Sequence, residues 1–227
     1  MTNNHFDQPV DRRPTSSQKW EKYRDTDILP LWVADTDFMA PAGVIEALQA
    51  RIDHGIFGYT NTPAELNQLV IARMQSLYNW TIEADWLVWL PGLVCGLNLA
   101  CRSVGASGDD IITAKPIYPP FMSSPRLSER NLVTVPMQRV EQRWLIDFVA
   151  LEQSITPSSR LLLFCNPHNP GGTVYRREEL QQLAELCRIH NLTICSDEIH
   201  CDLILEPGLT HIPLASLNAD IASRSIT

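Results

Sequence analysis

The sequence predicts an α/β fold with three layers, in which a mostly parallel β-sheet is covered by helices on both faces. The chain has 227 residues, of which 44% are hydrophobic and 19% charged, as in an ordinary globular protein. Beyond Trp86, short apolar runs alternate with helix-length segments, which is typical of parallel strands buried on both faces. Sheets of this kind bind ligands at the carboxyl ends of their strands.

Apolar residues at helical spacing predict helices over residues 41–54 and 63–78, and a third over about 177–190. A fourth helical pattern covers residues 92–104. Residues 1–30 are polar and predict an extended arm without a stable helix. The apolar runs that predict strands lie at residues 87–91, 109–116, 132–137, 160–167, 192–199 and, at the end of the chain, 220–227.

Charge and cysteine patterns exclude several classes of function. The net charge is −8 and no basic cluster is present, which argues against nucleic-acid or anionic-membrane partners and favours small molecules. The first residues carry no apolar segment after their charges, so we expect neither a secretory signal nor a membrane span, and a cytoplasmic protein. The six cysteines lack Cys-x-x-Cys spacing, which predicts small buried side chains and no metal site.

Two strand ends carry the polar residues that point to chemistry. The loop at residues 165–172, Cys-Asn-Pro-His-Asn-Pro-Gly-Gly, follows an apolar run and is rigid enough to fix its side chains. Asp197 ends the next apolar run, where a carboxylate is costly unless a cation or donors meet it. A protonated pyridine nitrogen is one such partner. The alternatives are an ordinary turn for Asn-Pro-Gly and a helix N-cap for Asp197.

The Asn-Pro-Gly loop followed by the Asp-x-x-His strand end resembles the fold-type I pyridoxal-phosphate enzymes of the class I/II aminotransferase superfamily. The segments LWVADTDFMAP and HGIFGYT are similar to the cystathionine β-lyase-type C–S lyases of the MalY/PatB group. The resemblance runs from about residue 10 to the final residue. It implies the large-domain fold of pyridoxal-phosphate transferases, incomplete at the C-terminus.

The resemblance implies a cofactor role for several residues. Asn169 matches the asparagine that hydrogen-bonds the 3′-oxygen of pyridoxal phosphate, and Asp197 matches the aspartate at the pyridinium nitrogen. His200 falls where many relatives have a tyrosine near that same oxygen, although a structural histidine is an equal alternative. Val94 and Cys95 lie in the matching phosphate loop, where their backbone N–H groups suit a phosphate, unless the segment is a plain glycine turn.

Two tyrosines complete the implied site. Tyr118 matches the aromatic residue that stacks on the pyridine ring, the alternative being a surface turn among prolines. Tyr59 matches a tyrosine that relatives lend across a dimer interface to the cofactor phosphate of a neighbour, which implies a homodimer. A tightly packed turn is the alternative for Tyr59.

The resemblance also implies a division of the chain and a missing group. Residues 1–50 match an N-terminal arm and part of a small domain, and residues 51–227 match the first part of the cofactor-binding large domain. The chemistry of this family begins with a lysine bound to the cofactor as a Schiff base. None of Lys19, Lys22 and Lys115 occupies the matching position, so we expect this lysine just after Thr227 and assign no catalytic residue within the chain.

The activity implied is that of a pyridoxal-phosphate-dependent C–S β-lyase. Such an enzyme converts cystathionine or a cysteine S-conjugate to pyruvate, ammonia and a thiol. Without the lysine, the truncated chain of 227 residues is expected to be inactive. The alternatives are a class I/II aminotransferase and, from a different class, a non-catalytic remnant or binding module.

Overall fold

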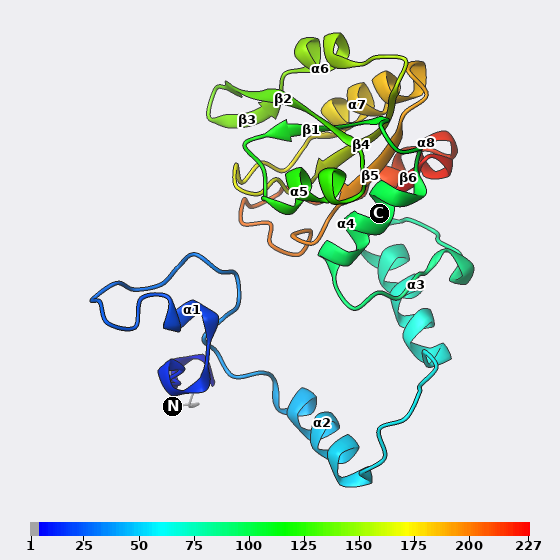
Figure 1. Ribbon diagram of the computed structural model, residues 1–227. Coiled ribbons are helices and arrows are strands. Elements are labelled where there is room, and N and C mark those ends of the chain that lie inside the picture. Colours follow the sequence, from blue (N-terminus) through cyan, green and yellow to red (C-terminus); the bar gives the residue numbers. More distant parts are fainter. Residues whose placement is uncertain (1–4) are drawn as a thin grey trace. The chain divides into compact units, whose positions relative to one another are not determined.

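The computed structural model describes residues 5–227, and the chain divides into two compact units, residues 1–61 and 62–227 (Figure 1). Each unit is built from its own elements. The predicted domain boundary between residues 50 and 51 stays a prediction. Among residues 5–227, no helix combines the length and the apolar character that crossing a membrane requires.

The first unit contains one long helix, α2 (Ala42–His54), where the sequence predicts it. Its end is set by Gly55, which adopts the left-handed conformation (φ +74°) and donates its N–H to the Ile52 carbonyl. The preceding arm is extended apart from short helical turns, in agreement with its polar sequence. These turns are η1 (His5–Asp7), η2 (Arg13–Thr15) and α1 (Gln18–Glu21).

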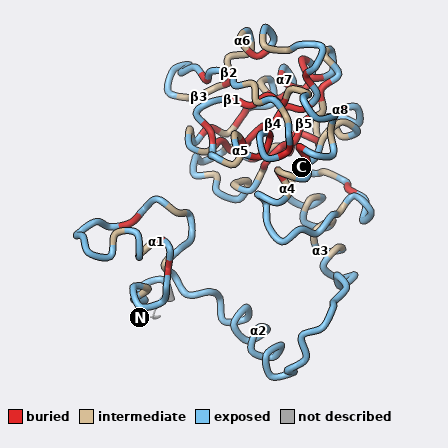
Figure 2. Tube along the Cα trace, viewed as in Figure 1, coloured by how far each residue is buried: buried red, intermediate tan, exposed pale blue. Residues whose placement is uncertain are grey.

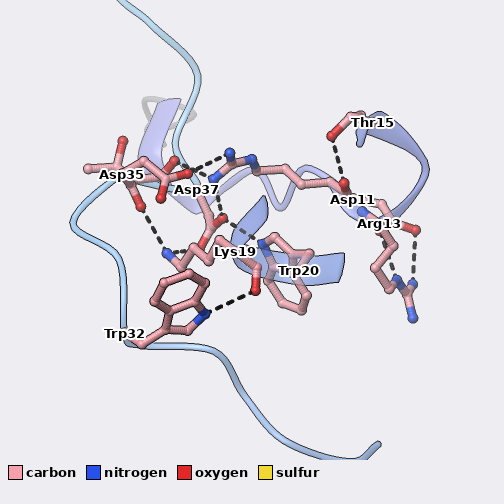
Figure 3. A network of polar contacts seen from close by, with 10 residues as sticks. Asp11, Arg13, Thr15, Lys19, Trp20, Trp32, Asp35 and Asp37 are labelled. Atoms are coloured by element: carbon pink, nitrogen blue, oxygen red, sulfur yellow. Dashed lines mark hydrogen bonds and ion pairs between the residues drawn. The ribbon is translucent and has the colours of Figure 1, made fainter. Parts of the chain in front are cut away.

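A network of charged groups holds the arm of the first unit together (Figure 3). Asp37 accepts hydrogen bonds from Lys19 Nζ at 2.9 Å, Trp20 Nε1 at 2.9 Å and Arg12 Nη1 at 2.8 Å. Arg12 also pairs with Asp35 at 2.6 Å, and Lys19 donates to the Asp35 carbonyl. These donors, Lys19 first, hold the pKa of Asp37 well below its usual range. The network fastens the segment around Asp35 and Asp37 to α1.

The second unit is built on a six-stranded sheet with the order β3-β2-β1-β4-β5-β6. All neighbouring strands are parallel except β3, which forms an antiparallel hairpin with β2. The mostly parallel sheet predicted from the sequence is therefore confirmed. Its strands are β1 (Asp110–Lys115), β2 (Asn131–Val140), β3 (Arg143–Ile146), β4 (Ser159–Cys165), β5 (Thr193–Asp197) and β6 (Ser225–Ile226).

Helices cover both faces of this sheet, as predicted (Figures 1 and 2). In β4, Leu162 and Phe164 join one core with α6 (Phe148–Ser154), α7 (Arg177–Ile189) and α8 (Ala219–Ser223). The alternate residues Leu161 and Leu163 join a second core with α4 (Leu93–Ser103) and α5 (Pro120–Leu127). Strand β4 is thus buried on both of its faces. The remaining elements are α3 (Ala64–Tyr78), η3 (Ala84–Trp86) and η4 (Leu214–Leu217).

Two predicted strands are wrong or displaced. Residues 87–91 pair with no strand of the described chain; Val88 and Trp89 are exposed, and the Trp89 indole donates to Asn67 Oδ1 at 2.9 Å. The final run begins as a helix instead, because Asn218 Oδ1 caps α8 by accepting from the Ile221 N–H at 3.0 Å. Only the two residues of β6 form a strand there.

The Asp37 network makes a prediction for the first unit. The Asp37→Ala substitution removes the carboxylate that accepts hydrogen bonds from Arg12, Lys19 and Trp20. It also leaves the buried Lys19 ammonium without its ion-pair partner. We expect backbone amides of residues 18–21 and 31–38 to exchange about 10-fold faster, as measured by hydrogen exchange. The matched control is Asp11→Ala, which removes only an exposed pair with Arg13. Equal exchange in the two variants would contradict this role.

Candidate active site

The parallel strands bring the predicted cofactor residues to one edge of the sheet. Because β1, β4 and β5 are parallel neighbours, their carboxyl ends lie at the same edge. Tyr118 follows β1, Asn169 follows β4 and Asp197 ends β5. Chain segments distant in sequence therefore meet where ligands of such sheets bind.

The N-terminus of α4 is directed to the same edge. The helix ends at Ser103, shortly before β1 begins, so it runs antiparallel to that strand. Its earliest internal bond joins the Gly96 N–H to the Gly92 carbonyl at 3.2 Å, which leaves the Val94 and Cys95 amides without helical partners. Free N–H groups at the positive end of a helix dipole suit an anion such as a phosphate.

Asp197 is a buried carboxylate with few donors. Side chains alternate along β5, so Asp197 lies on the same face as Cys195, which packs in the core with α4 and α5. Within the described chain it accepts one hydrogen bond, from the Ile199 N–H at 3.1 Å. Burial raises the pKa of Asp197, and it also raises the pKa of the neighbouring Cys165 thiol to about 12. A cation beside this carboxylate would offset its desolvation.

The residues at this edge fit pyridoxal phosphate. The buried and under-donated Asp197 carboxylate suits a protonated ring nitrogen, and the free amides of α4 suit a phosphate. His200 lies on the turn after β5 and is half-buried. Burial is the largest cause of the raised pKa of Asp197, and the hydrogen bond from the Ile199 N–H and the neighbouring His200 oppose it. Within residues 5–227, no cluster of three or more metal-ligating side chains is present.

The loop that carries Asn169 is fixed by its own backbone. The His168 N–H donates to the Thr173 carbonyl and the Gly172 N–H donates to the His168 carbonyl, both at 2.8 Å. A side chain at Gly171 would approach His168 Nδ1 to 2.7 Å, so only glycine fits there. Asn169 sits at the half-buried tip of this closed turn.

His168 is a residue of the site that the sequence did not single out. Its Nδ1 accepts from the Gly171 N–H at 3.1 Å, which requires the neutral ring with its proton on Nε2. Burial lowers the pKa of His168 to about 4, and the Pro116 carbonyl after β1 only partly offsets this. The only signal was its place inside the Asn-Pro-His-Asn-Pro loop.

Four of the predicted residues are exposed: Tyr59, Val94, Cys95 and Tyr118. Tyr118 is 41% exposed in the second unit, on the segment between β1 and α5. Tyr59 belongs to the first unit and is fully exposed, so it is not held in a tightly packed turn. Val94, Cys95, Asn169, Asp197 and His200 all belong to the second unit, and their contacts with a cofactor stay predictions.

The fold and this site define a class of protein, and the sequence comparison names it. Residues 26–224 match the family "Aminotransferase class I and II". This match covers most of the chain, which therefore belongs to the class I and II aminotransferase family.

Individual relatives narrow the similarity. The chain is 40% identical to cystathionine beta-lyase PatB of Bacillus subtilis over 98% of its length, and covers 59% of that protein. The crystal structure of OvoB superposes with a TM-score of 0.93 at 50% identity, over 97% of this chain and 58% of OvoB. Cystalysin of Treponema denticola, whose structure contains pyridoxal 5′-phosphate, gives 0.89 at 31% identity, over 97% and 57%. The chain thus spans little more than half the length of these relatives.

His168 predicts a pH dependence of stability. Its pKa is about 4 in the folded chain and about 6.5 in the unfolded chain, so the unfolded state binds the proton more readily. Stability from the neutral ring is complete above about pH 6.5 and is lost as the pH falls towards about 4, by roughly 2–3 kcal/mol. Urea unfolding across this range measures it.

The variant His168→Gln should lack this slope. His54→Gln, which removes an exposed histidine on α2, should retain it. An unchanged slope in the His168 variant would show that the site does not hold the ring neutral.

Proposed function

We propose that the protein carrying this chain is a pyridoxal-phosphate-dependent C–S β-lyase. The observation that carries the proposal is the buried carboxylate of Asp197 at the carboxyl edge of the sheet, the edge to which the N-terminus of α4 with its free amides is also directed. The similarity to cystathionine beta-lyase PatB and to pyridoxal-phosphate-containing cystalysin supports both the cofactor and the reaction. The substrate class is an amino acid with sulfur on its β-carbon.

The residues of this edge would hold the cofactor from several sides. Asp197 keeps the ring nitrogen protonated, and Asn169 donates to the 3′-oxygen from its closed turn, with His200 nearby. Tyr118 stacks on the ring, and the amides of Val94 and Cys95 bind the phosphate. The bound cofactor supplies an electron sink for the carbanion that forms when the substrate loses its α-proton.

The covalent lysine is proposed to follow Thr227. β6 is parallel to β5, so a residue that continues β6 enters the edge beside Asp197. Lys115 ends β1, which β4 separates from β5, about 10 Å away by ordinary strand spacing. Lys115 also lines an open cavity of about 450 Å³ on the β2 side, with Thr134 and Pro136 as neighbours. Lys115 is thus a poor candidate for the covalent bond.

Assembly and location complete the proposal. A homodimer is supported by Tyr59, whose fully exposed ring is available to the cofactor phosphate of a neighbouring copy. The acidic balance of the chain, −8, supports small-molecule rather than nucleic-acid or membrane partners. A cytoplasmic location is part of the proposal.

An aminotransferase is the second candidate. It is supported by the family itself, since the cofactor residues of the edge do not select elimination over amino-group transfer. A binding module without turnover is supported only by the absence of a suitably placed lysine within residues 62–227.

The reaction can be tested directly on the full-length protein that carries this chain. With cystathionine we expect pyruvate and a thiol at equal rates, without exchange of amino groups with added keto acids. Asp197→Asn should lower kcat/KM by at least about 100-fold, because the neutral amide cannot keep the ring nitrogen protonated. The control Asp202→Asn breaks only an exposed pair with Arg73 and should stay within about 2-fold. Keto-acid exchange without pyruvate would establish the aminotransferase instead.

The position of the covalent lysine can be tested separately. Borohydride reduction in the presence of pyridoxal phosphate, followed by peptide mapping, should label one lysine stoichiometrically. We expect that lysine to lie beyond Thr227, and Lys115→Arg to leave the labelling unchanged because of the separation of β1 from β5. Stoichiometric labelling of Lys115 would overturn the assignment.

A further inference from the structure

Next to Asp197 lies a buried hydrogen-bonded pair, Glu198 and His211, to which no role has been assigned. Glu198 follows Asp197 directly in the sequence. Its Oε2 forms a hydrogen bond with His211 Nε2, at a distance of 2.7 Å. The side chains are 9% and 1% exposed, respectively. A carboxylate buried in this way is stabilised only if several donors meet it.

Three donors from different parts of the second unit meet on Glu198. Oε2 binds His211, while Oε1 accepts from Ser196 Oγ at 2.8 Å and from the Leu214 N–H at 3.0 Å. Ser196 lies in β5 and Leu214 begins η4, so the carboxylate ties the end of the strand to a later turn. The residues on both sides of Asp197 are therefore fixed through one acceptor.

His211 extends this anchorage to a helix. Its ring packs edge-on against Tyr78 at the end of α3, with the centroids 5.5 Å apart. Nδ1 is buried and has no hydrogen-bond partner within the described chain. The ring is thus held by one strong hydrogen bond, to Glu198, and by packing.

Asp197 itself has no comparable anchor. Its single hydrogen bond within the described chain comes from the Ile199 backbone, so the direction of its carboxylate depends on the backbone between residues 196 and 199. That backbone is what Ser196 and Glu198 hold in place.

We propose that Glu198 and His211 are positioning residues, which fix the end of β5 so that the Asp197 carboxylate faces the ring nitrogen of the cofactor. This inference rests on the proposed function, since it requires pyridoxal phosphate at the edge of the sheet. Neither residue touches the cofactor; both act through Asp197.

A double-mutant cycle on the full-length protein distinguishes positioning from general support of the fold. Pyridoxal phosphate affinity is measured by absorbance titration in four proteins: unmodified, Glu198→Ala, Asp197→Asn and the double variant. Glu198→Ala should weaken binding about 10-fold in the unmodified background. It should change binding less than about 2-fold in the Asp197→Asn background, because the group it positions is then altered. The same loss in both backgrounds would overturn the proposal.

Milder variants cover the case in which Glu198→Ala does not fold. Ser196→Ala removes one donor to Glu198 and should weaken binding about 3-fold, again only where Asp197 is intact. Glu198→Gln keeps acceptors for Ser196 and Leu214 and should restore most of the affinity lost in Glu198→Ala. The matched control is Asp202→Ala, an exposed carboxylate on the following turn, with unchanged affinity expected.

The outcomes separate this inference from the proposed function. If the unmodified protein does not bind pyridoxal phosphate, the proposed function fails and the positioning role with it. If it binds, but Ser196→Ala and Glu198→Ala act equally with and without the Asp197 carboxylate, only the positioning role fails. Coupled effects together with unchanged melting temperatures of the cofactor-free proteins would support it.

Discussion

Burial of β4 on both of its faces is the constraint on which the second unit depends. Leu162 and Phe164 pack in one core and Leu161 and Leu163 in the other, so both faces need helices. Helices that cover a sheet on both sides are accommodated by parallel strands with crossover connections. Parallel strands in turn place all their carboxyl ends at one edge. The location of the site therefore follows from how the apolar residues of the central strand are buried.

The edge created in this way tolerates polar groups that the core does not. Asp197 is buried at the carboxyl end of β5, and Asn169 lies on a turn closed by backbone hydrogen bonds. His168 remains neutral in the same turn because burial disfavours its charge. The neutral His168 ring supplies no positive charge, and the Asp197 carboxylate accepts one hydrogen bond within the described chain. A cation such as a pyridinium would therefore stabilise Asp197.

Polar networks act differently in the two units. In the first unit, the Asp37 network is partly exposed and joins segments near each other in sequence, in place of an apolar core. In the second unit, the Glu198–His211 pair is almost fully buried and joins a strand, a turn and a helix. A buried pair loses more when one partner is removed, because the remaining charge or donor cannot reach water. The buried Glu198–His211 network therefore holds the attached segments in a single orientation more strongly than the partly exposed Asp37 network does.

The sequence by itself determined the elements whose signal is local. Helices α2, α3 and α7 follow from apolar spacing, strands β1, β4 and β5 from apolar runs, and Asn169 and Asp197 from their place after such runs. The cap of α8 by Asn218 and the β2–β3 hairpin are local features that the apolar runs did not indicate, whereas the tertiary structure decided that residues 87–91 pair with no strand of the described chain. It also decided the pairing of Glu198 with His211 and the neutral state of His168. Hydrogen bonds and desolvation of this kind arise only when separate segments are packed together, so no local pattern encodes them.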